Sequence, residues 1–415
     1  MNRRSSSCTT RRLVSGAVGA ALLCLLPSCL TPGAGDYPSE SGRQGADAEA
    51  PAEQLPAAED ALIPNAPSPP IEPAAADQVE PLLRSTTVPW SPFLRPPAPP
   101  VRFLARFPTG NEPKSVLFSH DGSVLYVPLL ADSGVDRIDL RTGEQQRIQP
   151  DGYGGLLGFV EATVGHEATH VYVSQMTAGM IHRLQGSVFV DTIPAHGRWP
   201  KVVAVHPTSP LLAVSNWLDD TVTVVDSESG ALVSRLSTDG TTPRGVAFSA
   251  DGALLYVSYF GNGMLACFDT ARWAQRWIVS LGGALRHIVL ARDGTRAYVS
   301  DMLRRQVLEL GLKEGGAVVE ARFATGPNPN TVVLTPDERY LLVSSRGPNN
   351  PEGYRLPSPE GGAIRIFDAA TRQLITTVPG GLQPTGLAVS PDGKMLAFSN
   401  FQDDTVELYD LSNLP

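Results

Sequence analysis

The stretch Pro243-Arg244-Gly245-Val246-Ala247-Phe248-Ser249-Ala250-Asp251-Gly252 contains the pattern that decides the fold. A proline and a polar residue precede a short apolar run, and this run ends at a Ser-x-Asp-Gly turn. A second apolar run, Leu255-Tyr256-Val257-Ser258, follows the turn. Two short apolar runs joined by a glycine-containing turn are typical of paired antiparallel strands.

This two-strand pattern occurs seven times after residue 100. Its turns lie 43, 42 and 44 residues apart between Thr208 and Asp337, and an insertion near residues 347–361 lengthens the next interval to 55 residues. A third apolar run that often ends in Asp and a fourth run follow each pair, as in residues 221–226 and 230–234. A period of about 40–45 residues with four short strands is typical of β-propeller blades. The copies begin at Pro113, Phe159, Pro200, Pro243, Leu285, Pro329 and Pro384.

We therefore predict an all-β fold over residues 101–415: a seven-bladed β-propeller of four-stranded antiparallel blades. The chain stops directly after the third strand of the seventh copy, and residues 101–107 form a further apolar run before the first copy. We expect this N-terminal run to be the outermost strand of the last blade, which closes the ring and removes an open edge. Cys267 lies in an apolar run and is expected to be a buried small hydrophobic residue.

The Tyr-Val-Ser strands and Ser-x-Asp-Gly turns resemble those of the YVTN-type seven-bladed propellers. Longer strings, such as Val214-Ser215-Asn216-Trp217 and Arg286-His287-Ile288-Val289-Leu290, resemble the YncE-like exported bacterial propellers. The resemblance covers about residues 101–415 and implies the fold. It implies no single activity, since the superfamily includes surface proteins, lactonase-like enzymes and the haem d1 domain of nitrite reductases.

Residues 1–28 have the features of an export signal. Arg3, Arg4, Arg11 and Arg12 precede a 14-residue apolar stretch that is too short to be a stable membrane anchor. The string Leu26-Pro27-Ser28-Cys29 resembles a bacterial lipobox, which implies a lipoprotein-type signal peptide and a lipidated Cys29. An ordinary signal peptide cut near Ser28 is the alternative, and the choice between Sec and twin-arginine export stays open.

Residues 29–100 are predicted to be a disordered tether rich in Pro, Ala and acidic residues. Residues 31–100 contain 16 prolines, ten acidic residues and three basic residues, which cannot bury a core. Because Leu30 follows the lipobox instead of Asp, we expect an outer-membrane lipoprotein that faces the periplasm or the cell surface. The lipid anchor is then its contact with the membrane, and we expect a monomer.

The formal net charge of −9 argues against nucleic acid as a partner, because nucleic-acid binding requires a basic surface. His166-Glu167-Ala168-Thr169-His170 matches the zinc motif H-E-x-x-H, which needs a helix to bring both imidazoles to one metal. Here the motif falls in the turn between the first two strands of the second copy, so we expect no zinc site. We also expect no other cofactor.

Candidate functional residues occur at equivalent positions of the copies. The segments that enter the first strand and those that leave the second strand lie on one face of a propeller, so their side chains surround one mouth of the central funnel. These residues favour a binding or interaction module for an anionic small molecule or envelope protein. Bases that are solvated, or paired with Glu161, Asp219 and Asp220, are the alternative. The candidates are Lys114, Glu161, Lys201, Trp217, Arg244, Phe260, Arg286, His287, Asn330 and Arg346.

Catalysis is the competing class of function, and we expect binding rather than catalysis. A lactonase-like or other hydrolytic enzyme needs an acid and a base, for which Glu161 and His287 are the candidates. A propeller that binds haem d1 needs an axial histidine over the channel, and His287 is the candidate for that ligand as well.

Overall fold

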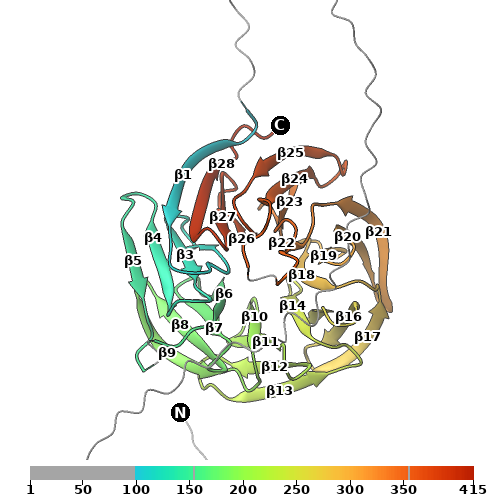
Figure 1. Cartoon of the computed structure of the whole chain (residues 1–415). Helices are drawn as coiled ribbons and strands as arrows, with labels where there is room; N and C mark the ends of the chain where they lie inside the picture. Colours follow the sequence, from blue (N-terminus) through green and yellow to red (C-terminus); the bar gives the residue numbers. More distant parts are fainter. Residues whose placement is uncertain (1–98, 153–154, 354–355) are drawn as a thin grey trace, which may run out of the picture. The chain divides into compact units, whose positions relative to one another are not determined.

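The computed structural model describes residues 99–152, 155–353 and 356–415, all of which belong to one compact unit. The described residues form seven four-stranded antiparallel sheets arranged as blades around a central axis (Figure 1). The predicted seven-bladed propeller is therefore confirmed. Among these residues there is no helix of the length and apolarity needed to cross a membrane. The predictions for residues 1–98, including the signal peptide, Cys29 and the tether, lie outside the described residues.

Each blade follows the chain from an inner to an outer strand, except that the seventh takes its outer strand from the N-terminal side. Blade 1 contains β2 (Leu117–Phe118), β3 (Val124–Pro128), β4 (Val135–Asp139) and β5 (Gln145–Ile148). Blade 2 contains β6 (Phe159–Val164), β7 (Val171–Gln175), β8 (Met180–Gln185) and β9 (Val188–Pro194). Blade 3 contains β10 (Pro200–Val205), β11 (Leu211–Asn216), β12 (Thr221–Asp226) and β13 (Leu232–Ser237). Blade 4 contains β14 (Pro243–Phe248), β15 (Leu254–Tyr259), β16 (Met264–Asp269) and β17 (Ala274–Ser280).

Blade 5 contains β18 (Leu285–Leu290), β19 (Arg296–Asp301), β20 (Gln306–Lys313) and β21 (Gly316–Ala324). Blade 6 contains β22 (Pro329–Leu334), β23 (Tyr340–Ser345), β24 (Ala363–Asp368) and β25 (Leu374–Pro379). Blade 7 contains β26 (Pro384–Val389), β27 (Met395–Asn400), β28 (Thr405–Asp410) and β1 (Arg102–Pro108).

The ring is closed by β1, which pairs antiparallel with β28 as the sequence predicted. Two ion pairs reinforce this junction. Arg102 contacts Asp410 at 2.8 Å between exposed positions, and Arg106 contacts Glu407 at 2.8 Å. The Glu407 carboxylate is 2% exposed, so Arg106 provides the countercharge for a carboxylate that is buried beside the strand.

The hydrophobic core lies between neighbouring blades. One cluster, for example, joins Tyr256, Leu265 and Cys267 of blade 4 to Leu285 and Ile288 of blade 5. Cys267 is fully buried, as predicted, and burial raises the pKa of its thiol to about 11. The thiol is therefore protonated at neutral pH and acts as a small apolar side chain.

In blades 2 to 6 a serine in the second strand connects the blade to the next one. In blades 2 to 7 the inner strand has a β-bulge, so that two of its residues lie opposite this one serine. Ser215 illustrates the contacts: its Oγ accepts a hydrogen bond from the N–H of Val202 at 3.0 Å and donates to the carbonyl of Arg244 in the next blade at 3.1 Å. The bulge serines are Ser174, Ser215, Ser258, Ser300, Ser344 and Ser399.

The Ser-x-Asp-Gly turns lie at the opposite end of the same strands. In blade 4 the Ser249 hydroxyl donates to the Asp251 carboxylate at 2.6 Å, and the backbone N–H of Ala253 donates to the same carboxylate at 3.0 Å. In blade 1 the Ser119 hydroxyl and the N–H of Ser123 lower the pKa of Asp121 to about 2. The repeated turn motif therefore has a structural role, because its ionised aspartate holds the backbone of the turn.

Removing β1 is expected to destabilise the propeller strongly. A chain that begins at residue 109 leaves an open edge on β28 and removes the Arg106 partner of buried Glu407, which costs about 3 kcal/mol or more. Thermal melting of this chain should be compared with that of a chain beginning at residue 100. Arg102→Ala, which breaks only the exposed ion pair, should cost less than about 1 kcal/mol. Equal melting of the two chain lengths would show that the ring is closed without β1.

Removing a bulge serine is expected to weaken two blades at once. Ser215→Ala leaves a buried N–H and a buried carbonyl unsatisfied, so unfolding in denaturant should show a loss of about 1–3 kcal/mol. Ser237→Ala on the exposed outer strand of the same blade is the matched control and should change stability by less than about 0.5 kcal/mol. Equal effects of the two substitutions would contradict a linking role for Ser215.

Candidate functional site

The bulges place two successive residues of each inner strand next to the axis. The residues opposite the serine therefore form two layers. We call the layer of the first residue of each pair the upper layer and that of the second residue the lower layer. The upper layer contains Lys114, Val160, Lys201, Arg244, Arg286, Asn330 and Thr385. The lower layer contains Ser115, Glu161, Val202, Gly245, His287, Thr331 and Gly386. Blade 1 has the same two positions although Pro128 replaces its serine.

The structure thus places four predicted bases at one repeat position, and it buries them. Their exposed fractions are 2% for Lys114, 1% for Lys201, 3% for Arg244 and 5% for Arg286. The alternative in which these bases are solvated is therefore wrong. Burial of a charged side chain is costly unless other groups compensate for the lost hydration, so the contacts of these bases matter.

Aromatic rings compensate two of the lysines. The Lys201 ammonium lies 5.1 Å from the ring centre of Trp199 and 5.3 Å from that of Trp217, and it is 3.2 Å from the sulfur of Met176. The Lys114 ammonium lies 4.6 Å from the ring centre of Phe401. Such cation–π contacts contribute about 2 kcal/mol or more when they are desolvated.

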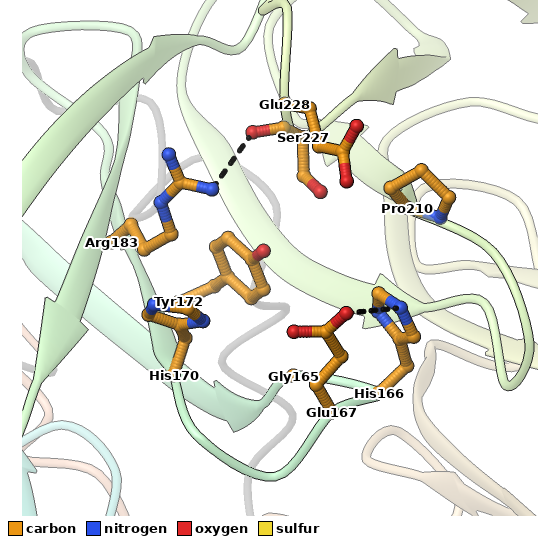
Figure 2. Close-up of a pocket in the computed structure, with 9 residues that line it drawn as sticks. All are labelled: Gly165, His166, Glu167, His170, Tyr172, Arg183, Pro210, Ser227 and Glu228. Carbon is orange, nitrogen blue, oxygen red and sulfur yellow. Dashed lines mark hydrogen bonds and ion pairs between the residues drawn. The ribbon is translucent and has the colours of Figure 1, made fainter.

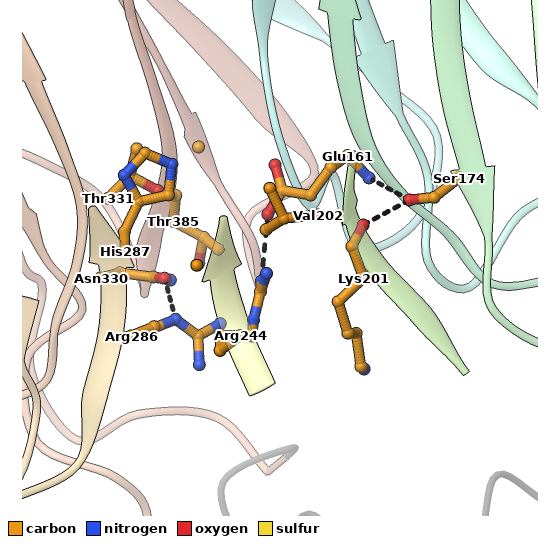
Figure 3. A network of polar contacts seen from close by, with 12 residues as sticks. Glu161, Ser174, Lys201, Val202, Arg244, Arg286, His287, Asn330, Thr331 and Thr385 are labelled. Atoms are coloured by element: carbon orange, nitrogen blue, oxygen red, sulfur yellow. Dashed lines mark hydrogen bonds and ion pairs between the residues drawn. The ribbon is translucent and has the colours of Figure 1, made fainter. Parts of the chain in front are cut away.

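Glu161 occupies a different position from the one the sequence suggested. Its place in the repeat is one residue later than that of the bases, and Val160 has their position. From blade 2 the carboxylate reaches Arg244 of blade 4 at 3.0 Å, so the two side chains meet near the axis (Figure 3). Glu161 therefore pairs with one of the bases. Asp219 pairs with exposed Arg198, and Asp220 accepts the N–H of Thr242.

Two further polar contacts connect blades 5, 6 and 7. Arg286 Nε donates to Asn330 Oδ1, as Figure 3 shows. Arg346 donates to Gln383, and its guanidinium lies 5.5 Å from the ring centre of Phe401. Arg346 leaves the second strand of its blade, as predicted, and is buried.

An apolar cluster lies beside the bases of blades 3 to 5. Trp217, Phe260 and Met302 follow the second strands of these blades and pack with Ala284. The rings of Trp217 and Phe260 have their centres 5.3 Å apart. Sequence analysis identified Trp217 and Phe260 but missed Trp199, which packs against the cluster and against Lys201. Its position directly before Pro200 was the signal, because the residue before the inner strand faces the same loops.

His287 lies in the lower layer of blade 5. Burial is the main cause that lowers the pKa of its imidazole to about 4; the charges of Arg244 and Arg286 lower it further, and that of Glu161 opposes the shift. The imidazole is therefore neutral at pH 7. Its Nδ1 is buried and has no hydrogen-bond partner among the described residues.

The H-E-x-x-H segment lies at the other end of the strands, in the turn between β6 and β7 as predicted. Its histidines line a cleft between blades 2 and 3, where His166 and His170 stand on opposite sides of Glu167 (Figure 2). His166 lies 3.8 Å from Glu167, and His170 contacts Thr169. Within the described ranges no group of three His, Cys, Asp or Glu side chains is arranged to hold a metal ion. The absence of zinc stays a prediction, which metal analysis of the purified chain tests.

Comparison with known proteins agrees with this architecture. Antigen Lp49 of Leptospira interrogans serogroup Icterohaemorrhagiae serovar copenhageni is 35% identical over 321 residues, which are 74% of this chain and 69% of the relative. The chain belongs to the YncE-like family of seven-bladed β-propellers. The uncharacterised protein YncE of Salmonella typhimurium shares 25% identity with this YncE-like propeller over 194 residues. The match covers 46% of the chain and half of that relative. A sequence profile described as "Lactonase, 7-bladed beta-propeller" matches residues 274–413 of the YncE-like propeller.

The buried imidazole predicts an acid-sensitive fold. Because the folded pKa of His287 is near 4 and an unfolded histidine titrates near 6.5, the unfolded state binds more protons between these values. Stability should therefore fall as the pH falls from about 6.5 to about 4, by at most about 1.4 kcal/mol per pH unit from this group. His287→Gln should flatten this dependence in denaturant unfolding, whereas His120→Gln in an exposed turn should not. Equal pH dependence of wild type and His287→Gln would contradict the assignment.

Proposed function

We propose that this chain is a ligand-binding module whose central site takes an anionic small molecule. The observation that carries the proposal is the set of four buried bases at one repeat position around one axis. Cations that converge in a partly dehydrated site focus the electrostatic potential more strongly than bases scattered on a surface. The described propeller residues are mildly acidic overall, so this concentration of bases does not follow from composition.

The apolar cluster supports a small molecule over an envelope protein as the ligand. Trp217, Phe260 and Met302 lie in the same three blades as Lys201, Arg244 and Arg286. Small-molecule sites combine apolar side chains with a few polar groups that fix the orientation of the ligand. The bases are 5% exposed or less, so the flat surface of a partner protein fits them poorly.

A hydrolytic function is supported less well. The lactonase-like profile matches only residues 274–413. Of the two candidate acid/base residues, Glu161 is held by Arg244, and His287 is a neutral, partly buried imidazole. A haem d1 site would use the same His287 as an axial ligand. The positive charges of Arg244 and Arg286 near this histidine favour an anionic ligand there.

A thermal-shift series tests the binding function. We expect sodium benzoate, acetate and phosphate to raise the melting temperature of the full chain in a saturable way at constant ionic strength, whereas benzamide and acetamide should not. The paired substitution Lys201→Met and Arg286→Met keeps apolar stems in place and should weaken anion binding about tenfold or more. Arg198→Met, which removes an exposed base, is the matched control.

Two outcomes would contradict the binding proposal. In the first, no anion stabilises the wild-type chain. In the second, Lys201→Met with Arg286→Met leaves anion affinity unchanged while the melting temperature without ligand is retained. Anion binding with unchanged affinity in that variant would place the anion elsewhere on the molecule.

We also propose that the chain is an exported lipoprotein of the outer membrane, anchored through Cys29. The lipobox-like string and the proline-rich segment after it support this location. Cys29→Ala should move the protein from the membrane fraction to the soluble fraction of cells. Ser28→Ala, which keeps a small residue before the cysteine, should leave it in the membrane. A Cys29→Ala protein that stays with the membrane would refute the lipid anchor.

A further inference from the structure

Four buried polar atoms in the two axial layers have no hydrogen-bond partner among the described residues: Ser115 Oγ, Arg244 Nη1, His287 Nδ1 and Asn330 Nδ2. The last three come from the adjacent blades 4, 5 and 6. Leaving a buried polar atom without a partner is destabilising. Three such atoms on neighbouring inner strands therefore indicate a place where another molecule supplies the missing partners.

The contacts of Asn330 and Arg244 fix the roles of two of these atoms. Arg286 Nε donates to Asn330 Oδ1, so the amide oxygen is engaged and Nδ2 is the atom left to donate. Arg244 Nη2 donates to Glu161 at 3.0 Å, so Nη1 is the guanidinium atom left to donate. The guanidinium and the amide thus offer one donor nitrogen each, and the His287 imidazole lies beside Asn330 (Figure 3).

We propose, on the basis of the binding function above, that Arg244 Nη1 and Asn330 Nδ2 hold one carboxylate group of the ligand. Each N–H donates to a carboxylate oxygen. Glu161 is a positioning residue, because it holds the guanidinium through Nη2 and leaves Nη1 without a partner among the described residues.

The charge of Glu161 also selects the class of anion. A carboxylate brings one negative charge, whereas inorganic phosphate at pH 7.5 is mostly a dianion. Because the repulsion between like charges grows with the charge of the ligand, the Glu161 carboxylate repels a dianion more than a monoanion. In the Arg244–Glu161 pair this guanidinium already donates a hydrogen bond to a carboxylate oxygen at 3.0 Å. The charge of Glu161 therefore favours a carboxylate over a phosphate.

Asn330→Asp tests the donor role in the full-length chain. The substitution keeps the shape of the side chain and the acceptor for Arg286, but it replaces the Nδ2 donor by an oxygen that repels an anion. We expect benzoate affinity, measured by calorimetry at pH 7.5, to fall at least about tenfold. Asn111→Asp adds the same charge at an exposed position on the same face and should have little effect. Unchanged benzoate affinity in Asn330→Asp would overturn the carboxylate site.

Glu161→Gln provides a second test that does not remove a donor. The glutamine oxygen still accepts from Arg244, but the negative charge is lost. Wild type should prefer benzoate to inorganic phosphate. Glu161→Gln should raise phosphate affinity more than benzoate affinity, so that the ratio of phosphate affinity to benzoate affinity rises about tenfold relative to wild type. An unchanged ratio of the two affinities would overturn the selectivity assigned to Glu161.

The outcomes separate this site from the proposed function as a whole. Wild type that binds neither benzoate nor phosphate refutes the binding function, and the carboxylate site with it. Anion binding that is weakened by Lys201→Met with Arg286→Met but not by Asn330→Asp leaves the binding function in place and refutes the carboxylate site. If Asn330→Asp fails to fold, as its melting curve will show, the affinity ratio in Glu161→Gln decides.

Discussion

The hydrogen bonds of one serine in each of blades 2 to 7 determine the geometry of the centre of this propeller. The serine accepts from the backbone of its own inner strand, and in five blades it also donates to the inner strand of the next blade. A bulge of two residues opposite one serine is the backbone arrangement in which the N–H and the neighbouring carbonyl are both satisfied. The spacing of the blades and the direction of the axial side chains follow from this arrangement.

Blade 1 shows what changes when the serine is absent. Pro128 replaces it, and the inner strand β2 has only two residues, compared with six in the inner strands of blades 2 to 7. A proline has neither a side-chain donor nor a backbone N–H, so the two side-chain hydrogen bonds of the serine are missing here. Backbone hydrogen bonds from Gly158 to Leu130 and from Phe159 to Leu129 connect blade 1 to blade 2 instead. Blade 1 also packs against blade 7, where Gly386 lets the backbones approach closely: a Cβ there would lie 2.6 Å from Ser115.

The buried bases are the feature of the centre that stability does not explain. Replacing a buried charge network by apolar residues of similar volume is often neutral or stabilising. Cation–π contacts and the Arg244–Glu161 ion pair reduce the cost of burial, but Arg244 Nη1, His287 Nδ1 and Asn330 Nδ2 have no hydrogen-bond partner among the described residues. These unpartnered atoms support the ligand site proposed above, and the bulges are what bring them next to the axis.

The sequence by itself determined the fold, because a propeller is a local pattern repeated. Period, turn residues and strand pairing all act within one copy, and the apolar run at residues 101–107 had no partner except the incomplete last blade. The repeat also located the bases, since equivalent positions in successive copies occupy equivalent places around the axis. Three features appear only in the folded structure: the burial of the bases, the one-residue offset of Glu161 and its pairing with Arg244. They depend on the bulges and on contacts near the axis between different blades, since Glu161 and Arg244 are 83 residues apart in the chain. Local sequence patterns contain no information about such contacts, because the closed ring brings these residues together.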